Sequence, residues 1–206
     1  MRSFSKKKRG SENRRRKPVI LIIAEGRNVT ESLYFKSFQE QRSDFNIKIL
    51  RPGHVTDPNG MLQKLLGYWE QYEMDGDNGD KAFIVLDLDC NSEKGKQIRK
   101  LECKSNAAQF IVSNPCFEVW FLLHFRYSAK SYRIGNQAVQ ELRNYIPKYE
   151  KNLDVAPLLA DKLDTAMNNA AKLTKYYADN VWPSDSCNPR TDVPIIIDAI
   201  FNELKR

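Results

Sequence analysis

Two carboxylates one residue apart follow an apolar run in the middle of the chain. Residues 83–95 read FIVLDLDCNSEKG, so four apolar residues lead directly into the segment of Asp87 and Asp89. On an extended segment, side chains at positions i and i+2 point to the same face. Two negative charges held this close repel each other and resist losing water, and a cation between them would remove that cost. Taken alone, the pattern leaves two interpretations open, a cation site and a strand that ends in an acidic turn.

A third carboxylate, Glu25, ends an earlier apolar run, VILIIA. In an open parallel sheet, ligands bind beyond the carboxyl ends of the strands. If the two strands are neighbours, Glu25, Asp87 and Asp89 converge at this rim. Hard oxygen donors of this kind suit Mg²⁺ or Mn²⁺, with water or phosphate oxygens in the remaining positions. The helix predicted to follow Glu25 could also accept a phosphate at its N-terminus.

Alternating strand and helix patterns position these carboxylates. Strands are predicted at residues 19–24, 45–50, 81–89 and 107–113, and helices at residues 30–41, 58–74 and 93–104. From Pro115 onward the chain reads as helical, at residues 117–125, 134–145, 155–179 and 193–205. This order predicts an α/β fold, a parallel sheet of about four strands covered on both faces. Residues 18–125 would form the sheet domain, and residues 126–206 a helical extension packed on it.

The positive charge of the chain is concentrated at its N-terminus. The formal net charge is +7, yet residues 1–17 hold nine Lys or Arg and one Glu, and the remainder has a net charge of −1. Such an arm is expected to be disordered until it meets a polyanion, nucleic acid above all. The alternative is a solubilising tail. The basic residues assigned to nucleic-acid binding are Lys6, Lys7, Lys8, Arg9, Arg14, Arg15, Arg16 and Lys17.

Several classes of protein and site are not expected. No apolar run approaches the roughly 20 residues of a membrane span, and the basic N-terminus lacks the apolar segment of a secretory signal. The four cysteines are widely spaced and only two histidines are present, which argues against a structural zinc site. Reduced thiols in a cytoplasmic protein are the simplest interpretation. The run DGDNGD at residues 75–80 lacks the distal glutamate of an EF-hand and is predicted to be a solvated turn.

Two further glutamates are candidates for the same site. Glu31 lies in the first turn of its predicted helix, where it either compensates the helix dipole, a contribution of about 0.3–1 kcal/mol, or supports or binds the metal. Glu118 stands in the apolar run FEVWFLLHF, where an unpaired carboxylate is costly to bury. It lies just beyond the fourth predicted strand, so the interpretation as a catalytic residue is favoured over helix capping.

Three other polar positions have competing interpretations. Asn114 precedes Pro115 and therefore favours extended geometry, so it either ends the strand or orients Glu118. His124 is more readily explained as a hydrogen-bonded core histidine than as a catalytic one. Arg190 and Thr191 could contact phosphate, although capping of the last helix by Thr191 or Asp192 is favoured.

Three motifs resemble a known family. AEGRNVTESLYF at residues 24–35, followed by a strand that ends in DLD, resembles a Toprim domain, with a glutamate after the first strand and DxD after the third. Together with SNPCFEVWFLLHF at residues 113–125 and NPRTDVPIIIDAI at residues 188–200, it is similar to the RloB-like (abortive-infection) family of bacterial defence proteins. The similarity spans nearly the whole chain.

The resemblance implies a Toprim-type metal site, a nuclease role in anti-phage defence and association with a partner ATPase. Glu25, Asp87 and Asp89 would hold Mg²⁺ or Mn²⁺, Glu118 would join them in catalysis, and Glu31, Asn114 and His124 would support them. The alternative is a non-catalytic subunit that binds nucleic acid or regulates the ATPase. Nucleotidyl transfer, which primases perform on the same scaffold, would need a nucleotide pocket for which no glycine-rich or basic motif is present.

Overall fold

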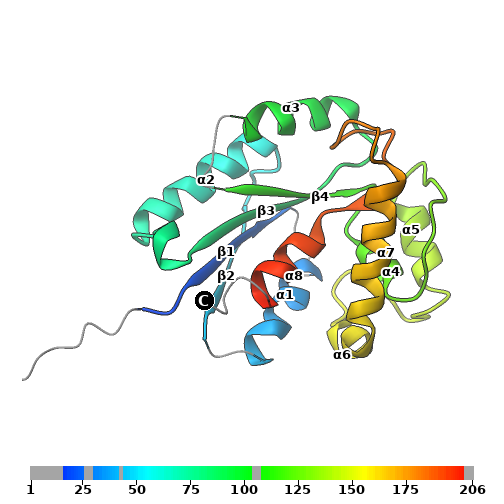
Figure 1. Ribbon diagram of the computed structural model, residues 1–206, viewed down its shortest axis with the longest axis horizontal. Coiled ribbons are helices and arrows are strands. Elements are labelled where there is room, and N and C mark those ends of the chain that lie inside the picture. The colour runs from blue at the N-terminus through cyan, green and yellow to red at the C-terminus, as the bar shows by residue number, and fades with distance from the viewer. Residues whose placement is uncertain (1–15, 26–29, 42–43, 104–107, 202–206) are drawn as a thin grey trace, which may run out of the picture.

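The protein folds around one mostly parallel sheet (Figure 1). The computed structural model describes residues 16–25, 30–41, 44–103 and 108–201. Five strands lie in the order β2-β1-β3-β4-β5. Their bounds are β1 Val19–Ala24, β2 Asn46–Leu50, β3 Lys81–Asp87, β4 Gln109–Asn114 and β5 Arg190–Thr191. The first four run parallel and β5 is antiparallel to β4. The expected Toprim-like α/β sheet flanked by helices is confirmed, and β1 does lie beside β3.

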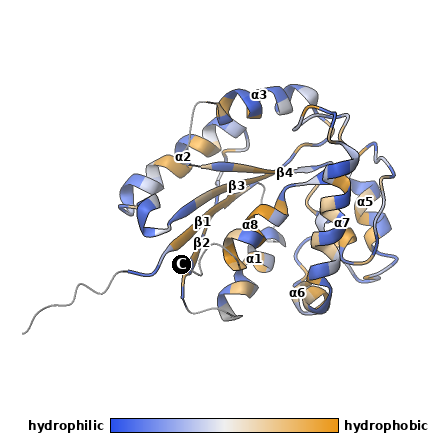
Figure 2. Ribbon diagram, viewed as in Figure 1, coloured by the Kyte–Doolittle hydropathy of each residue, from blue (hydrophilic) through white to orange (hydrophobic). Residues whose placement is uncertain are grey.

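Helices cover both faces of this sheet. Their bounds are α1 Thr30–Gln41, α2 Pro58–Gln71, α3 Ser92–Glu102, α4 Glu118–Leu123, α5 Gly135–Leu142, α6 Ala156–Leu159, α7 Leu163–Tyr176 and α8 Val193–Phe201. In Figure 1, α2 and α3 lie above the sheet, and α1 and α8 lie below it. Much of the strand length is orange, and so hydrophobic, in Figure 2, as expected of strands covered on both faces.

The two-residue period of β1 divides its side chains between two cores. Ile20 and Ile22 are fully buried in a cluster that includes residues of α1, α4, α7 and α8. Leu21 and Ile23 are fully buried in a second cluster, with residues of α2 and α3. Because successive side chains of a strand point to opposite faces, an unbroken apolar run fits a strand with helices on both sides.

Three of the differences from the predicted elements have a clear structural basis. Strand β3 ends at Asp87 rather than residue 89. The helix expected over residues 155–179 is interrupted, because the backbone at Lys162, with φ −115° and ψ 8°, leaves the helical region between α6 and α7. The two-residue strand β5 was not predicted, since so short a segment has no detectable periodicity; it forms by pairing with the end of β4.

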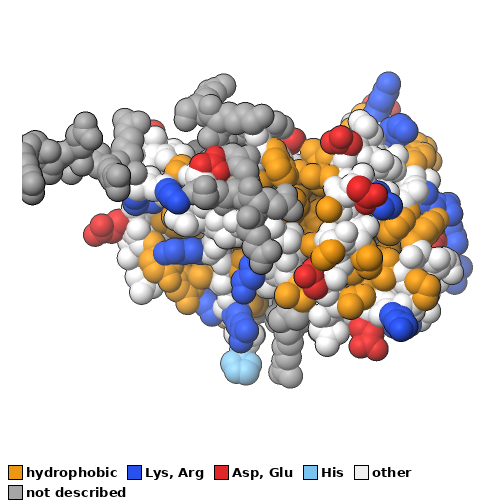
Figure 3. Space-filling view, turned by 90° about the horizontal axis from the view of Figure 1, so that it is seen from below, with side chains coloured by type: hydrophobic (Ala, Val, Ile, Leu, Met, Phe, Trp, Pro, Cys, Tyr) orange, Lys and Arg blue, Asp and Glu red, His pale blue; other side chains and the backbone are white. Residues whose placement is uncertain are grey.

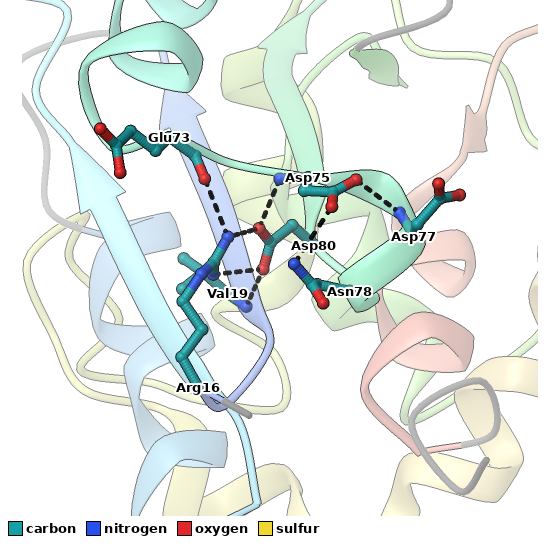
Figure 4. Close-up of polar contacts among 7 residues, drawn as sticks. All are labelled: Arg16, Val19, Glu73, Asp75, Asp77, Asn78 and Asp80. Carbon is teal, nitrogen blue, oxygen red and sulfur yellow. Dashed lines mark hydrogen bonds and ion pairs between the residues drawn. The ribbon is translucent and has the colours of Figure 1, made fainter. Parts of the chain in front are cut away.

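A buried carboxylate fixes the start of the sheet at the edge where β1 and β3 begin. Asp80 accepts hydrogen bonds from the backbone N–H groups of Val19 and Asp75, at 2.8 Å each. It also accepts from the guanidinium of Arg16, which in turn donates to the carbonyl of Glu73 (Figure 4). The last arginine of the basic arm is therefore bound to the folded body, at the edge of the sheet opposite the carboxyl ends of its parallel strands.

Candidate metal centre

The carboxyl ends of β1 and β3 lie together at one rim of the sheet. Ala24 pairs with Val85, and the N–H of Glu25 donates to the carbonyl of Val85 at 2.9 Å. Asp87, the last residue of β3, pairs with Ser113 of β4. The sheet therefore places Glu25 and Asp87 on neighbouring strands, as the apolar runs predicted.

The chain turns sharply after Asp87. Leu88 is fully buried, and Asp89 has a φ of 56°, in the left-handed region. The N–H of Asp89 donates to the carbonyl of Pro115, and that of Cys90 to Oδ1 of Asn114, at 2.9 and 3.1 Å. Asp87 and Asp89 are therefore not on the one extended segment that their spacing had predicted.

An ammonium group joins the two outer carboxylates of the rim. Nζ of Lys94, in the first turn of α3, lies 2.8 Å from Oε2 of Glu25 and 3.6 Å from Oδ2 of Asp89. The side chain of Asp89 is 64% exposed, whereas those of Lys94 and Glu25 are 13% and 22% exposed. Glu25, Lys94 and Asp89 thus form an ion-pair group, called here the outer group.

Asp87 and two glutamates, Glu31 and Glu118, form a second and more deeply buried set of carboxylates. Desolvation raises the pKa of Asp87 well above its usual range, and the negative charges of Glu31 and Glu118 raise it further. Desolvation also raises the pKa of Glu31, to about 7, with a further contribution from the charge of Glu118. Mutual repulsion of this kind requires proximity, so Glu31, Asp87 and Glu118 make up an inner group contributed by α1, β3 and α4.

The loop between α5 and α6 closes over the inner group. The hydroxyl of Tyr149 donates a hydrogen bond of 2.9 Å to Oε1 of Glu118, and Nζ of Lys151 lies 3.9 Å from the same oxygen. Burial lowers the pKa of Lys151, but the negative charges of Glu118 and Asp87 outweigh it, so the pKa is raised overall. The hydroxyl of Thr30 donates to the carbonyl of Lys151, which ties this loop to the start of α1.

The inner group has the donor chemistry that Mg²⁺ requires. Oε2 of Glu31 and Oε2 of Glu118 are buried, and neither has a hydrogen-bond partner within the described part of the chain. Glu118 is only 2% exposed, so its unpartnered oxygen is costly to bury unless a cation or a proton is bound to it. Hard carboxylate oxygens suit Mg²⁺ or Mn²⁺. In the present conformation, no three His, Cys, Asp or Glu side chains of the described residues converge closely enough to hold an ion.

Glu118 does not cap its helix. It is the first residue of α4, no side chain caps the N-terminus of that helix, and its carboxylate is bonded to Tyr149 instead. Glu31 likewise lies near other carboxylates, since the charges of Glu118 and Glu25 both raise its pKa. The structure therefore places Glu31 and Glu118, both predicted from the sequence, at the rim where β3 ends.

Asn114 and His124 lie in different surroundings from each other. Besides accepting from Cys90, Asn114 donates from Nδ2 to the carbonyls of Ser184 and Cys187 at 3.2 and 2.9 Å. Asn114 therefore holds the turn that carries Asp89, rather than contacting Glu118. His124 is buried beside Trp120 and Tyr34, with Nδ1 3.0 Å from the carbonyl of Trp120. Its surroundings are those of a core histidine.

Sequence reasoning did not single out Lys94, Tyr149 or Lys151. Lys94 stands in a run of charged residues, SEKGKQIRK, that is typical of any exposed helix. Tyr149 and Lys151 belong to the segment 146–152, which was predicted only as a loop. One available signal was the position of Lys94, because a cation in the first turn of a helix opposes the helix dipole.

Of the basic arm, the structure describes only Arg16 and Lys17. Residues 1–15, with Lys6, Lys7, Lys8, Arg9, Arg14 and Arg15, lie outside the described residues. Arg16 is engaged with Asp80, while Lys17 is exposed. The assignment of the arm to nucleic-acid binding stays a prediction.

A cavity of about 700 Å³ lies between α7, α8 and the segment that joins them, and none of the carboxylates of the two groups lines it. Trp182 donates from Nε1 to Asp192 at 2.7 Å, and the guanidinium of Arg190 lies 4.6 Å from the ring of Trp182. The hydroxyl of Thr191 accepts from the N–H of Val193 at 3.3 Å, which is the capping role favoured for this residue.

Comparison with protein-family models matches residues 20–200 to the family of RloB-like proteins. The chain belongs to the RloB-like family. Searches of curated proteins and of solved structures gave no match. The matched region of this RloB-like protein contains all six residues of the outer and inner groups, and also Lys151. Membership is consistent with a defence-associated role. No helix in the described part of the chain is long and apolar enough to cross a membrane.

Proposed function

We propose that this RloB-like protein is a Mg²⁺-dependent nuclease that hydrolyses phosphodiester bonds of DNA or RNA. It would work in the cytoplasm in anti-phage defence by abortive infection, together with a partner ATPase. The observation that carries the proposal is the gathering of Glu31, Asp89 and Glu118 near Asp87 at the carboxyl rim of the sheet, with buried, unpartnered oxygens on Glu31 and Glu118. The position is the one where parallel sheets bind ligands.

Asp87 is the residue on which the proposed metal site depends. Asp87 could be joined by the outer carboxylates Glu25 and Asp89 or by the inner carboxylates Glu31 and Glu118. In either case the three residues would supply three hard oxygen donors. A divalent cation, when bound, supplies charge stabilisation for the phosphate under attack and a more acidic water. In the chain itself, Glu118, oriented by the hydrogen bond from the hydroxyl of Tyr149, would accept the proton that the attacking water loses, and Lys151 would offer its ammonium to a phosphate oxygen.

A cleavage assay tests this function directly. Supercoiled plasmid, linear duplex, single-stranded DNA and RNA are incubated with the purified full chain and Mg²⁺ or Mn²⁺, alone and with the ATPase that co-purifies from the native host. We expect metal-dependent cleavage that Asp87→Asn abolishes and that Asp77→Asn, in an exposed loop, leaves intact. Cleavage that is equal in Asp87→Asn, or no cleavage of any substrate with or without the partner, would contradict the proposal.

A second function, a non-catalytic subunit that binds nucleic acid or regulates the ATPase, is favoured by a specific observation. Lys94 and Lys151 already offset part of the carboxylate charge, so the two groups could be structural ion pairs. Basic and acidic side chains are interspersed on the face shown in Figure 3, which agrees with the near-neutral charge of the body. Calorimetry separates the two functions, because Mn²⁺ binding that depends on the carboxylates is expected only of the nuclease.

A further inference from the structure

The cavity between α7, α8 and the segment that joins them has the size of a ligand pocket. Its volume is about 700 Å³, and pockets for small molecules range over about 300–1,000 Å³. Much of its wall is apolar, made by Met167, Ala170, Ala171, Ala178, Pro194 and Ile195. The polar part of the wall includes two cations, Lys175 and Arg190, and two carboxylates, Asp192 and Asp198. A mostly apolar hollow with a few polar groups is the usual form of a site for a small organic molecule.

Within the described residues, the guanidinium of Arg190 has no ion-pair partner. It lies 4.6 Å from the ring of Trp182, and its buried Nε donates to no oxygen of the described part of the chain. A guanidinium stays charged at every ordinary pH, and its fork of N–H groups fits the oxygens of a carboxylate or a phosphate. Because Arg190 is half-buried on the cavity wall, an oxyanion in the cavity would be the partner that this guanidinium lacks.

Asp192, two residues further along the chain, is held by other groups. Its Oδ2 accepts a hydrogen bond of 2.7 Å from Nε1 of Trp182 and one of 3.4 Å from the N–H of Val112. Burial raises the pKa of Asp192 to about 6, although the positive charge of Arg190 acts in the opposite direction. The carboxylate therefore fixes the indole against which Arg190 lies, instead of pairing with the guanidinium.

The part of the wall that carries Arg190 is held in place by the rest of the fold. Strand β5 pairs with the end of β4, and the hydroxyls of Ser113 and Thr191 lie 2.7 Å apart between them. The segment that joins α7 to β5 packs on α3, where a Cβ at Gly95 would lie 2.6 Å from the carbonyl oxygen of Pro183. Only a glycine allows so close an approach. A wall fixed in this way does not have to be ordered by the ligand, which favours binding.

We propose that this cavity binds a small organic oxyanion. The carboxylate or phosphate of the ligand lies at the guanidinium of Arg190, and its apolar body packs against the alanines of α7. Lys175 adds a second positive charge on the same wall. The residues of the outer and inner groups do not line the cavity, and binding there needs no metal. The proposal therefore does not rest on the proposed nuclease function.

The test is calorimetric titration of the full chain, in EDTA, with four probes of matched shape. Naphthyl phosphate and naphthoate carry the two kinds of oxyanion on the same ring system. Naphthol has the ring without the oxyanion, and inorganic phosphate has the oxyanion without the ring. Wild type should bind naphthyl phosphate or naphthoate about tenfold more tightly than either of the other two, because a hydrogen bond to a charged group has an effect of that size. The tighter of the two anionic probes identifies the kind of oxyanion that the cavity takes.

Three variants locate the bound probe. Arg190→Gln should weaken binding of the preferred anionic probe about tenfold and leave that of naphthol unchanged. Ala171→Leu, at an exposed position of α7 on the cavity wall, should weaken binding of the anionic probe and of naphthol, because the larger side chain fills the space of the apolar body. Asn168→Leu is the matched control: Asn168 is exposed on the same helix, does not line the cavity, and should leave every affinity unchanged.

Circular dichroism establishes that each variant is folded, and Ala171→Leu carries the test if Arg190→Gln does not fold. Three results would overturn the proposal. They are the absence of binding of both anionic probes to wild type at concentrations up to about 1 mM, equal affinities for naphthol and the anionic probes, and an anion affinity that Arg190→Gln or Ala171→Leu leaves unchanged. None of these results bears on metal-dependent cleavage, and a failure of the cleavage assay leaves the cavity proposal standing.

Discussion

The hydroxyl of Tyr149 donates to Oε1 of Glu118 at 2.9 Å, which joins the loop between α5 and α6 to the first residue of α4. The contact spans 31 positions of the chain and lies in the buried part of the candidate metal centre. Desolvation raises the pKa of Tyr149, and the charge of Glu118 raises it further, so the phenol keeps its proton and remains a donor.

Replacing Tyr149 by Phe should destabilise the protein. The substitution keeps the ring but removes the donor to a carboxylate that already has one unpartnered oxygen. A buried hydrogen bond to a charged group contributes about 1.5–3 kcal/mol, and we expect a loss of that size in the free energy of unfolding, measured in urea. Tyr72→Phe, at an exposed ring, should change it by less than about 0.5 kcal/mol. Equal effects of the two substitutions would show that the Tyr149 contact contributes nothing.

Replacing Glu118 by Gln should stabilise the metal-free protein and abolish its response to metal. The amide removes a charge that repels Asp87 and Glu31, so at pH 8 the free energy of unfolding should rise by on the order of 1 kcal/mol. The increase in Tm that Mn²⁺ gives wild type, by binding the folded state alone, should be lost. Glu150→Gln, an exposed carboxylate of the neighbouring loop, should retain it. If Glu118→Gln lowers stability and keeps the Mn²⁺ response, Glu118 is a structural residue.

Asp80 should contribute more to stability than its partner Arg16. Burial alone would raise the pKa of Asp80, but hydrogen bonds from Arg16 and from two backbone N–H groups lower it overall. Asp80→Asn turns an acceptor into a partial donor opposite these N–H groups, and we expect a loss of about 1.5–3 kcal/mol in urea unfolding at pH 7. Arg16→Met should cost less than about 1 kcal/mol, because the Arg16 side chain is 40% exposed.

The same pKa shift fixes a pH dependence for Asp80. A carboxylate whose pKa is lower in the folded state stabilises the protein above its unfolded pKa and loses that contribution as the pH falls. The difference in stability between wild type and Asp80→Asn should therefore shrink on acidification below pH 4. A difference that is constant with pH would show that the charge of Asp80 is not what stabilises the fold.

His124 should make the protein sensitive to acid. Burial lowers its pKa from 6.5 to about 4, so the unfolded chain binds a proton that the folded chain does not between these values. Stability from this residue is therefore complete above pH 6.5 and falls as the pH decreases, by about 2 kcal/mol at pH 5. In urea unfolding, His124→Gln should remove this part of the decrease in the free energy of unfolding between pH 7.5 and 5. His54→Gln, outside the helices and strands, is the matched control and should keep it.

Much of the fold was predictable from the sequence because it depends on local patterns. The apolar run of β1 lies within two buried cores and was recognised residue for residue, and the Asp57–Pro58 start of α2 has the expected cap, with the carboxylate of Asp57 accepting from the N–H of Gly60 at 2.8 Å. Such signals act over a few residues, through side-chain period and backbone hydrogen bonds. They also placed Glu25 and Asp87 at the ends of two strands, which the structure shows to be neighbours.

The sequence by itself therefore determined the α/β class, the family and the rim at which carboxylates gather. Only the tertiary structure decided how they gather. The left-handed backbone of Asp89 depends on hydrogen bonds to Pro115 and Asn114, more than 20 positions away. Lys94, Tyr149 and Lys151 reach Glu25 and Glu118 across even longer separations, and no local pattern encodes such contacts. The reason is physical: the pKa and the partners of a buried carboxylate depend on every charge that folding brings near it, whatever its distance along the chain.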